Sequence, residues 1–155
     1  MARVRVLICG LCLLALASTV VAGGRAGAPP GPRPAVKGVT DGPPPAYVAT
    51  SRGSTWLSFS SYCWRSTCAD FISASCADKG TPKLYLQRGE VVHFHLGFRP
   101  KAVWIGFKRN IAQSLPAART TSWRVRRGGF FSLGARVTVG GANFSASYNG
   151  CIRLR

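Results

Sequence analysis

The stretch that most directly predicts the fold is VVHFHLGF, at residues 91–98. Large apolar side chains recur there at every second position, at Val92, Phe94, Leu96 and Phe98. Successive side chains of a β-strand point to opposite faces, so an apolar period of two predicts a strand with one buried face.

The same period continues on both sides of this stretch. Further alternating apolar positions are Leu84 and Leu86, Val103, Ile105 and Phe107, Trp123 and Val125, Phe131, Leu133, Ala135 and Val137, and Ile152 and Leu154. A first strand is expected over residues 55–61, and glycine or proline marks turns near residues 88–90, 99–101 and 127–129. About seven short strands predict an all-β fold, an immunoglobulin-like antiparallel β-sandwich.

The N-terminal segment has the pattern of a secretory signal peptide. Arg3 and Arg5 precede an almost wholly apolar run, and Val20 and Ala22 occupy the −3 and −1 positions of a cleavage site. We therefore expect a signal peptide over residues 1–22 and a secreted or extracellular protein, with cell-wall association as a possibility. An uncleaved anchor is the alternative, because the 17 residues 6–22 are at the short limit for crossing a bilayer.

Residues 23–46 hold seven of the chain's ten prolines and six glycines. Such a segment has little apolar surface to bury, so we expect a disordered linker. The folded domain is then predicted over residues 47–155, a common size for a single core.

Four cysteines follow the signal peptide: Cys63, Cys68, Cys76 and Cys151. An even number in an exported chain indicates two disulfide bonds, and three connectivities are possible. We favour a local Cys63–Cys68 bond and a long-range Cys76–Cys151 bond. The spacings lack the paired pattern of a structural zinc site.

The chain is strongly basic. Removing Arg3 and Arg5 from the 21 basic residues leaves 19 against four acids, a formal charge of +15. Such a charge attracts polyanions, and outside a cell these include envelope polymers, anionic lipid and released nucleic acid. The alternative is a compositional bias toward arginine, since net charge alone does not specify an activity.

On the predicted strands, the side chains that alternate with the core positions and point outward include many cations and aromatic rings. The outward set is Lys83, Tyr85, His93, His95, Trp104, Arg124, Arg126, Arg136, Arg153 and Arg155. From these we select five candidate polyanion-binding residues: Arg124, Arg126, Arg136, Arg153 and Trp104. Guanidinium groups bind phosphate or carboxylate bidentately, and exposed rings stack on bases. The alternative is that these residues divide between two sheets and form only a solvated exterior.

Conventional catalytic groups are few. A nuclease-like hydrolase could use Glu90 with His93 or His95, but no recognised catalytic motif surrounds them. The two histidines share one strand face and lack an evident third metal ligand. We therefore assign no catalytic residue, no metal and no cofactor.

The segment SYCW at residues 61–64, followed by CAD at residues 68–70, resembles a family of uncharacterised small exported proteins of Gram-positive bacteria, mostly actinobacteria. Residues 89–94 and 98–100 resemble the strand that follows in that family, so the likeness spans about residues 55–107. It implies export, a Cys63–Cys68 bond and an all-β domain, and it transfers no catalytic residue. Cys76 and Cys151 are additional to the family's pair.

Taken together, these patterns predict a monomeric, non-enzymatic binding module that engages acidic cell-envelope polymers or other polyanions. No defined small-molecule ligand is indicated. A basic hydrolase and a protein-interaction module that uses the exposed aromatics are the alternatives.

Overall fold

A computed structural model describes residues 27–32, 41–70, 75–107 and 112–155. Within these ranges the chain forms eleven β-strands in two sheets, so the all-β sandwich is confirmed. The described ranges contain no helix that could cross a membrane. The predicted signal peptide, residues 1–22, lies outside them, as do residues 23–26 and 33–40 of the expected linker. The immunoglobulin-like type of sandwich stays a prediction.

The smaller sheet has four antiparallel strands in the order β2–β1–β6–β9. Its members are β1 (Ala46–Thr50), β2 (Gly53–Trp56), β6 (Val91–Leu96) and β9 (Thr120–Arg124). The strand over residues 91–96 is therefore a central strand, with β1 on one side and β9 on the other.

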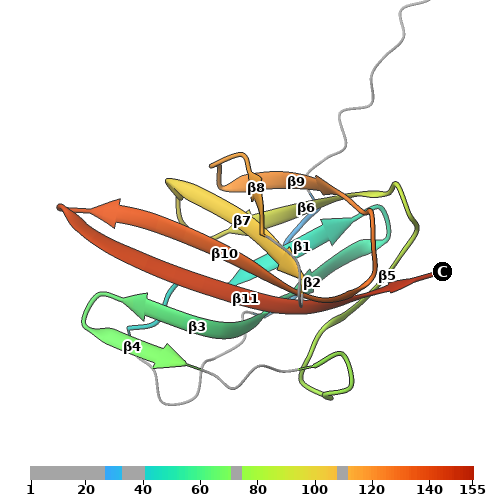
Figure 1. Cartoon of the computed structure of the whole chain (residues 1–155), viewed down its shortest axis with the longest axis horizontal. Coiled ribbons are helices and arrows are strands. Elements are labelled where there is room, and N and C mark those ends of the chain that lie inside the picture. The colour runs from blue at the N-terminus through green and yellow to red at the C-terminus, as the bar shows by residue number, and fades with distance from the viewer. Residues whose placement is uncertain (1–26, 33–40, 71–74, 108–111) are drawn as a thin grey trace, which may run out of the picture.

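The larger sheet has seven strands, and six of them follow the order β4–β3–β11–β10–β7–β8. Its members are β3 (Ser58–Trp64), β4 (Thr67–Asp70), β5 (Lys83–Leu86), β7 (Ala102–Phe107), β8 (Gln113–Leu115), β10 (Gly129–Val139) and β11 (Ala142–Leu154). The long β10–β11 hairpin runs along the length of the molecule (Figure 1). β5 pairs with the end of β11 in parallel, whereas the other pairs are antiparallel.

The core lies between the inner faces of the two sheets. Phe94 of β6 and Phe131 of β10 are fully buried, and their ring centroids are 5.8 Å apart. Phe107 of β7 packs against Trp123 of β9 in the same way, with centroids 5.5 Å apart. The predicted inward parity is thus confirmed in these strands. Leu154 is an exception, because it is 40% exposed near the chain end, where β11 has passed the core.

The structure has more strands than the expected seven: β1, β4 and β8 were not expected, and the expected strand over residues 55–61 is divided between two strands. β2 belongs to the smaller sheet and β3 to the larger one, and Leu57 between them is buried. The Leu57 amide donates to the Ala46 carbonyl at 2.9 Å, which satisfies the backbone at the crossing. An uninterrupted apolar and hydroxyl-rich sequence gave no sign of this change of sheet.

The segment before β1 is tied to the larger sheet. The hydroxyl of Tyr148, a fully buried residue of β11, donates to the Pro44 carbonyl at 2.6 Å. Burial raises the pKa of Tyr148, which keeps this hydroxyl a donor. Gly97 allows Pro44 to approach closely, since a Cβ at Gly97 would lie 2.4 Å from the Pro44 Cβ. β1 itself begins at Ala46, the last residue of the expected linker.

Two disulfide bonds are confirmed, Cys63–Cys68 and Cys76–Cys151. The first joins β3 to β4, and the second joins residues 75 positions apart and holds the loop before β5 against β11. Cys151 is fully buried beneath that loop. Such bonds form and persist in oxidising compartments, which fits an extracellular environment.

The two bonds predict different stability losses. In the chain-entropy model, removing Cys76–Cys151 with paired Cys→Ser substitutions lowers the free energy of unfolding by about 4–5 kcal/mol. Removing Cys63–Cys68 in the same way lowers it by about 2 kcal/mol, because a five-residue separation closes a much smaller loop. Urea unfolding of the two double variants measures both values. Equal losses would contradict the loop-length explanation.

Candidate polyanion-binding surface

The parallel pairing of β5 with β11 gathers cations at one end of the molecule. Lys83 is paired with Cys151, and Tyr85 with Arg153. Lys83, Tyr85 and Arg153 are all exposed, and Arg155 follows as the last residue of the chain. The expected outward parity of these positions is therefore seen along both strands.

Arg52 joins them from the turn between β1 and β2. Its Nη1 donates to the Tyr85 carbonyl at 2.7 Å, and Nε and Nη2 of Arg155 donate to the same oxygen at 3.3 and 3.2 Å. The Arg155 guanidinium also lies over the Tyr85 ring, 5.9 Å from its centroid. We call Arg52, Lys83, Arg153 and Arg155 the basic cluster. Three of these residues, Arg52, Lys83 and Arg155, line a shallow pocket of about 200 Å³.

One carboxylate borders the basic cluster. Glu90 Oε2 lies 3.7 Å from Nη2 of Arg52 and accepts from the Gln87 amide at 3.0 Å. Its other oxygen accepts from the Ser51 hydroxyl at 3.2 Å. The Glu90 side chain therefore stabilises the β5–β6 turn and orients Arg52, and it offsets one of the four positive charges.

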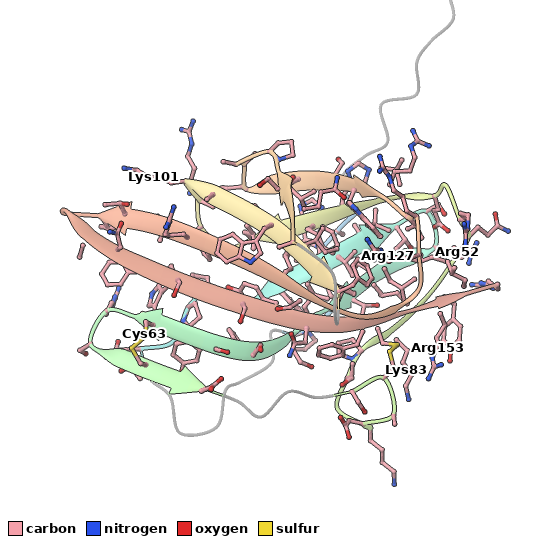
Figure 2. The ribbon with its side chains drawn as sticks, in the orientation of Figure 1. Arg52, Cys63, Lys83, Lys101, Arg127 and Arg153 are labelled. Carbon is pink, nitrogen blue, oxygen red and sulfur yellow. A yellow bond between two sulfur atoms is a disulfide. The ribbon has the colours of Figure 1, made fainter. Side chains whose placement is uncertain are left out.

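Further cations lie near the same end. Nη1 of Arg124 donates to the Gly89 carbonyl in the β5–β6 turn at 2.9 Å. Figure 2 shows Arg52, Lys83, Arg127 and Arg153 gathered at one end, whereas Lys101 extends from the opposite end. Several of the described cations are thus gathered at the end formed by β5 and the C-terminal part of β11.

The five predicted binding residues do not form one patch. Arg124 and Arg126 lie on and just after β9 of the smaller sheet, whereas Trp104, Arg136 and Arg153 belong to the larger sheet. Arg136 lies beside Lys101, whose amide donates to its carbonyl at 2.7 Å. Of the five, Arg153 alone belongs to the basic cluster.

Sequence reasoning placed Lys83, Tyr85 and Arg155 in the outward set but selected none of them as a binding residue. Arg52 was not in the outward set, because it lies in a turn, where side chains do not alternate between two faces as they do along a strand. The only available signal was that both strands of the β5–β11 pair place cations at alternating positions. Their parallel pairing could not be read from the sequence.

Trp104 lies in a separate shallow pocket on the outer face of the larger sheet. Its indole lies against Gly134 of β10, where a Cβ would be 2.1 Å from Trp104 Cε2. The pocket has a volume of about 420 Å³, and its other lining residues include both cysteines of the Cys63–Cys68 bond. Gly134 is therefore needed for the ring to lie flat on the sheet.

The two histidines of β6 make separate contacts with β9. Nδ1 of His93 is 2.9 Å from the Ser122 hydroxyl, and Nδ1 of His95 is 2.9 Å from the Thr120 hydroxyl. His95 was expected on the solvent face but is only 8% exposed, because its ring stacks on Tyr47 of β1 with centroids 4.4 Å apart. Across the described ranges, no group of three His, Cys, Asp or Glu side chains is positioned to hold a metal ion.

Comparisons with protein-family models, with curated proteins and with solved structures found no match to this chain. The resemblance of residues 61–64 and 68–70 to exported actinobacterial proteins stays a prediction. Function must therefore be argued from the surface that the fold assembles.

The buried His95 predicts a pH-dependent stability. Burial, reinforced by the neighbouring His93, lowers the pKa of His95 below its ordinary value. The unfolded chain then binds a proton more readily than the folded one, so stability is complete above about pH 7 and falls as the pH drops through the ordinary histidine range. Among the described residues, the groups that face His95 are Tyr47, Thr120, His93 and, on the pocket wall, Arg119, and none of them is a carboxylate.

Urea unfolding at pH 7.5 and pH 5.5 tests this expectation. A His95→Gln variant loses less stability between the two pH values than the wild type does. His93→Gln is the matched control and keeps most of the pH dependence, because burial is the larger cause of the shift. An unchanged dependence in His95→Gln would assign the effect to another group.

Proposed function

We propose that this protein is an exported binding module that engages acidic polymers through the basic cluster. One observation carries the proposal: two guanidinium groups, from Arg52 and Arg155, converge on the Tyr85 carbonyl beside Lys83 and Arg153. Like charges repel, so this arrangement favours an anion at the same place. Guanidinium forks bind phosphate and carboxylate oxygens in a bidentate manner.

The shape of the cluster favours a polymer over a small molecule. Its pocket of about 200 Å³ is smaller than ordinary ligand pockets of ~300–1,000 Å³. The Tyr85 side chain is 55% exposed and offers an aromatic surface beside the cations. A repeating anionic chain can contact several of these cations at once, which a compact ligand cannot do.

The formal charge, +17 for the whole chain and +15 once residues 1–22 are removed, supports the same function through long-range attraction. The whole chain contains only four acids, and Glu90 and Asp41 are already in ion pairs with Arg52 and Arg65. Acidic polymers of the cell envelope and single-stranded nucleic acid both carry the negative charge that a strongly basic protein attracts. The disulfide bonds are compatible with such an extracellular setting.

The contacts of Glu90 give it a structural role. Its carboxylate oxygens accept from the Ser51 hydroxyl and the Gln87 amide and pair with Arg52. Glu90 therefore holds the turn beside the basic cluster, which is the role that the binding-module proposal assigns to it.

Salt-dependent binding tests the proposal. The triple variant Lys83→Gln/Arg153→Gln/Arg155→Gln removes three charges from the basic cluster. Binding to labelled single-stranded DNA and to polyglycerol phosphate is measured by fluorescence anisotropy at several salt concentrations. We expect the slope of log affinity against log salt for DNA to become shallower by about 2, since each phosphate contact on a single strand contributes ~0.7.

The matched control removes three charges from the opposite end. Arg99→Gln/Lys101→Gln/Arg136→Gln has the same net charge as the cluster variant and should retain most of the wild-type slope. Equal losses in the two variants would mean that net charge alone, and not the basic cluster, drives binding. Wild-type affinity that does not respond to salt would exclude the function altogether.

A further inference from the structure

A row of three aromatic side chains crosses the outer face of the smaller sheet. Tyr47 of β1 is paired in register with Trp56 of β2 and with His95 of β6. The Tyr47 ring stacks on His95, and it meets the Trp56 ring edge-on at a centroid distance of 5.4 Å. These three residues line a pocket of about 520 Å³, which we call the aromatic groove.

Proline-rich parts of the chain lie against the aromatic residues of the groove. Residues 27–32, which we call the strap, contribute Pro29 and Gly31, and the segment before β1 contributes Pro44 and Pro45. This face lies on the sheet opposite to the one that carries Lys83 and Arg153. The aromatic groove and the pocket of the basic cluster share no lining residue.

The strap is held to the sheet through its carbonyl oxygens. The Ser54 hydroxyl of β2 donates to the Ala28 carbonyl at 2.6 Å, and the Tyr47 hydroxyl donates to the Gly27 carbonyl at 3.4 Å. Gly27 also packs closely on β1, since a Cβ there would lie 3.0 Å from the Cβ of Ala49. This contact helps to explain why Ala49, on the outer face, is almost completely buried.

The polar groups of the aromatic groove suit a ligand that is rich in acceptors. Proline has a carbonyl but no N–H, so an extended proline-rich segment offers mainly acceptors. Tyr47 and Trp56, which carry a hydroxyl and an indole N–H, line the groove, and the Ser54 hydroxyl of β2 binds the strap. Aromatic side chains that carry a donor are the means by which proteins recognise polyproline II segments.

The strap satisfies these groups incompletely. In the part of the chain that the structure describes, Trp56 Nε1 and His95 Nε2 are buried without a hydrogen-bond partner. His95 is more than nine-tenths buried, and its other ring nitrogen is engaged by Thr120. An unsatisfied buried polar group costs free energy, so the groove has unused binding capacity in this arrangement.

We propose that the aromatic groove is a binding site for an extended proline-rich peptide segment, and that the strap is its intramolecular occupant. The strap has the matching chemistry, because its sequence from Gly27 is GAPPGP. A covalently attached occupant competes at an effective concentration in the millimolar range. A partner with proline-rich sequence displaces it by also accepting a hydrogen bond from the unsatisfied indole of Trp56.

Peptide titration of the full chain tests this proposal. The probe is a capped synthetic peptide with the sequence of residues 26–34, added to 15N-labelled protein. In the wild type it competes with the strap, whereas Pro29→Gly/Pro30→Gly frees the strap backbone and weakens that competition. We expect the peptide to bind this double variant about tenfold more tightly than the wild type, and to shift the indole N–H resonance of Trp56.

Three controls identify the groove and the type of ligand. Trp56→Phe in the Pro29→Gly/Pro30→Gly background weakens binding about tenfold, because the free peptide, unlike the tethered strap, is able to place a carbonyl against the indole N–H of Trp56. Trp104→Phe, which alters a tryptophan on the other sheet, leaves binding unchanged. A peptide in which every proline is replaced by alanine fails to bind, because it has lost the polyproline II conformation.

Two results would overturn the proposal. One is the absence of saturable binding at millimolar peptide to a Pro29→Gly/Pro30→Gly protein whose amide spectrum shows an intact fold. The other is binding that is equal in the Trp56→Phe and Trp104→Phe proteins. Neither result bears on the basic cluster, because the peptide assay involves no polyanion.

Discussion

The packing of one apolar sheet face against another is the constraint on which the whole molecule depends. Phe94 of β6 and Phe131 of β10 meet at its centre, and every strand around them must keep its large apolar side chains on the same parity. A shift of one residue in register would move that apolar set to the solvent side. This requirement leaves the opposite face of each strand free for polar, charged and aromatic side chains, and both proposed sites include residues from those positions.

The basic cluster depends on two connections that hold the chain end in place. The Cys76–Cys151 bond attaches the loop before β5 to β11, and β5 then pairs with β11 in parallel. Parallel pairing aligns Lys83 and Tyr85 with Cys151 and Arg153, so cations from distant parts of the sequence share one face. Arg52 reaches this face from the other sheet through the Tyr85 carbonyl. The cluster is therefore a property of the junction between the sheets rather than of either sheet alone.

The aromatic groove shows that a strand position on the outer face of a sheet can also be buried. His95 has the alternating position of a surface residue, yet Tyr47 on the neighbouring strand covers it and burial lowers its pKa. The proline-rich strap lies over the same sheet and engages two hydroxyl donors through its carbonyls. An apparently featureless proline and glycine segment thus has a defined contact with the sandwich, because an acceptor-rich backbone complements a surface rich in donors.

Sequence periodicity was sufficient to predict an all-β sandwich and the inward parity of its main strands, because burial of one strand face acts on local sequence. The two disulfide bonds were predicted from the even number of cysteines that follow the expected signal peptide. Periodicity could not reveal the change of sheet at Leu57, the burial of His95 or the grouping of Arg52 with Arg155. Each of these depends on which strand lies beside which, and strand order is decided by contacts between residues far apart in the chain. The amino-acid pattern therefore established which side chains face outward, and three-dimensional packing established which of them meet.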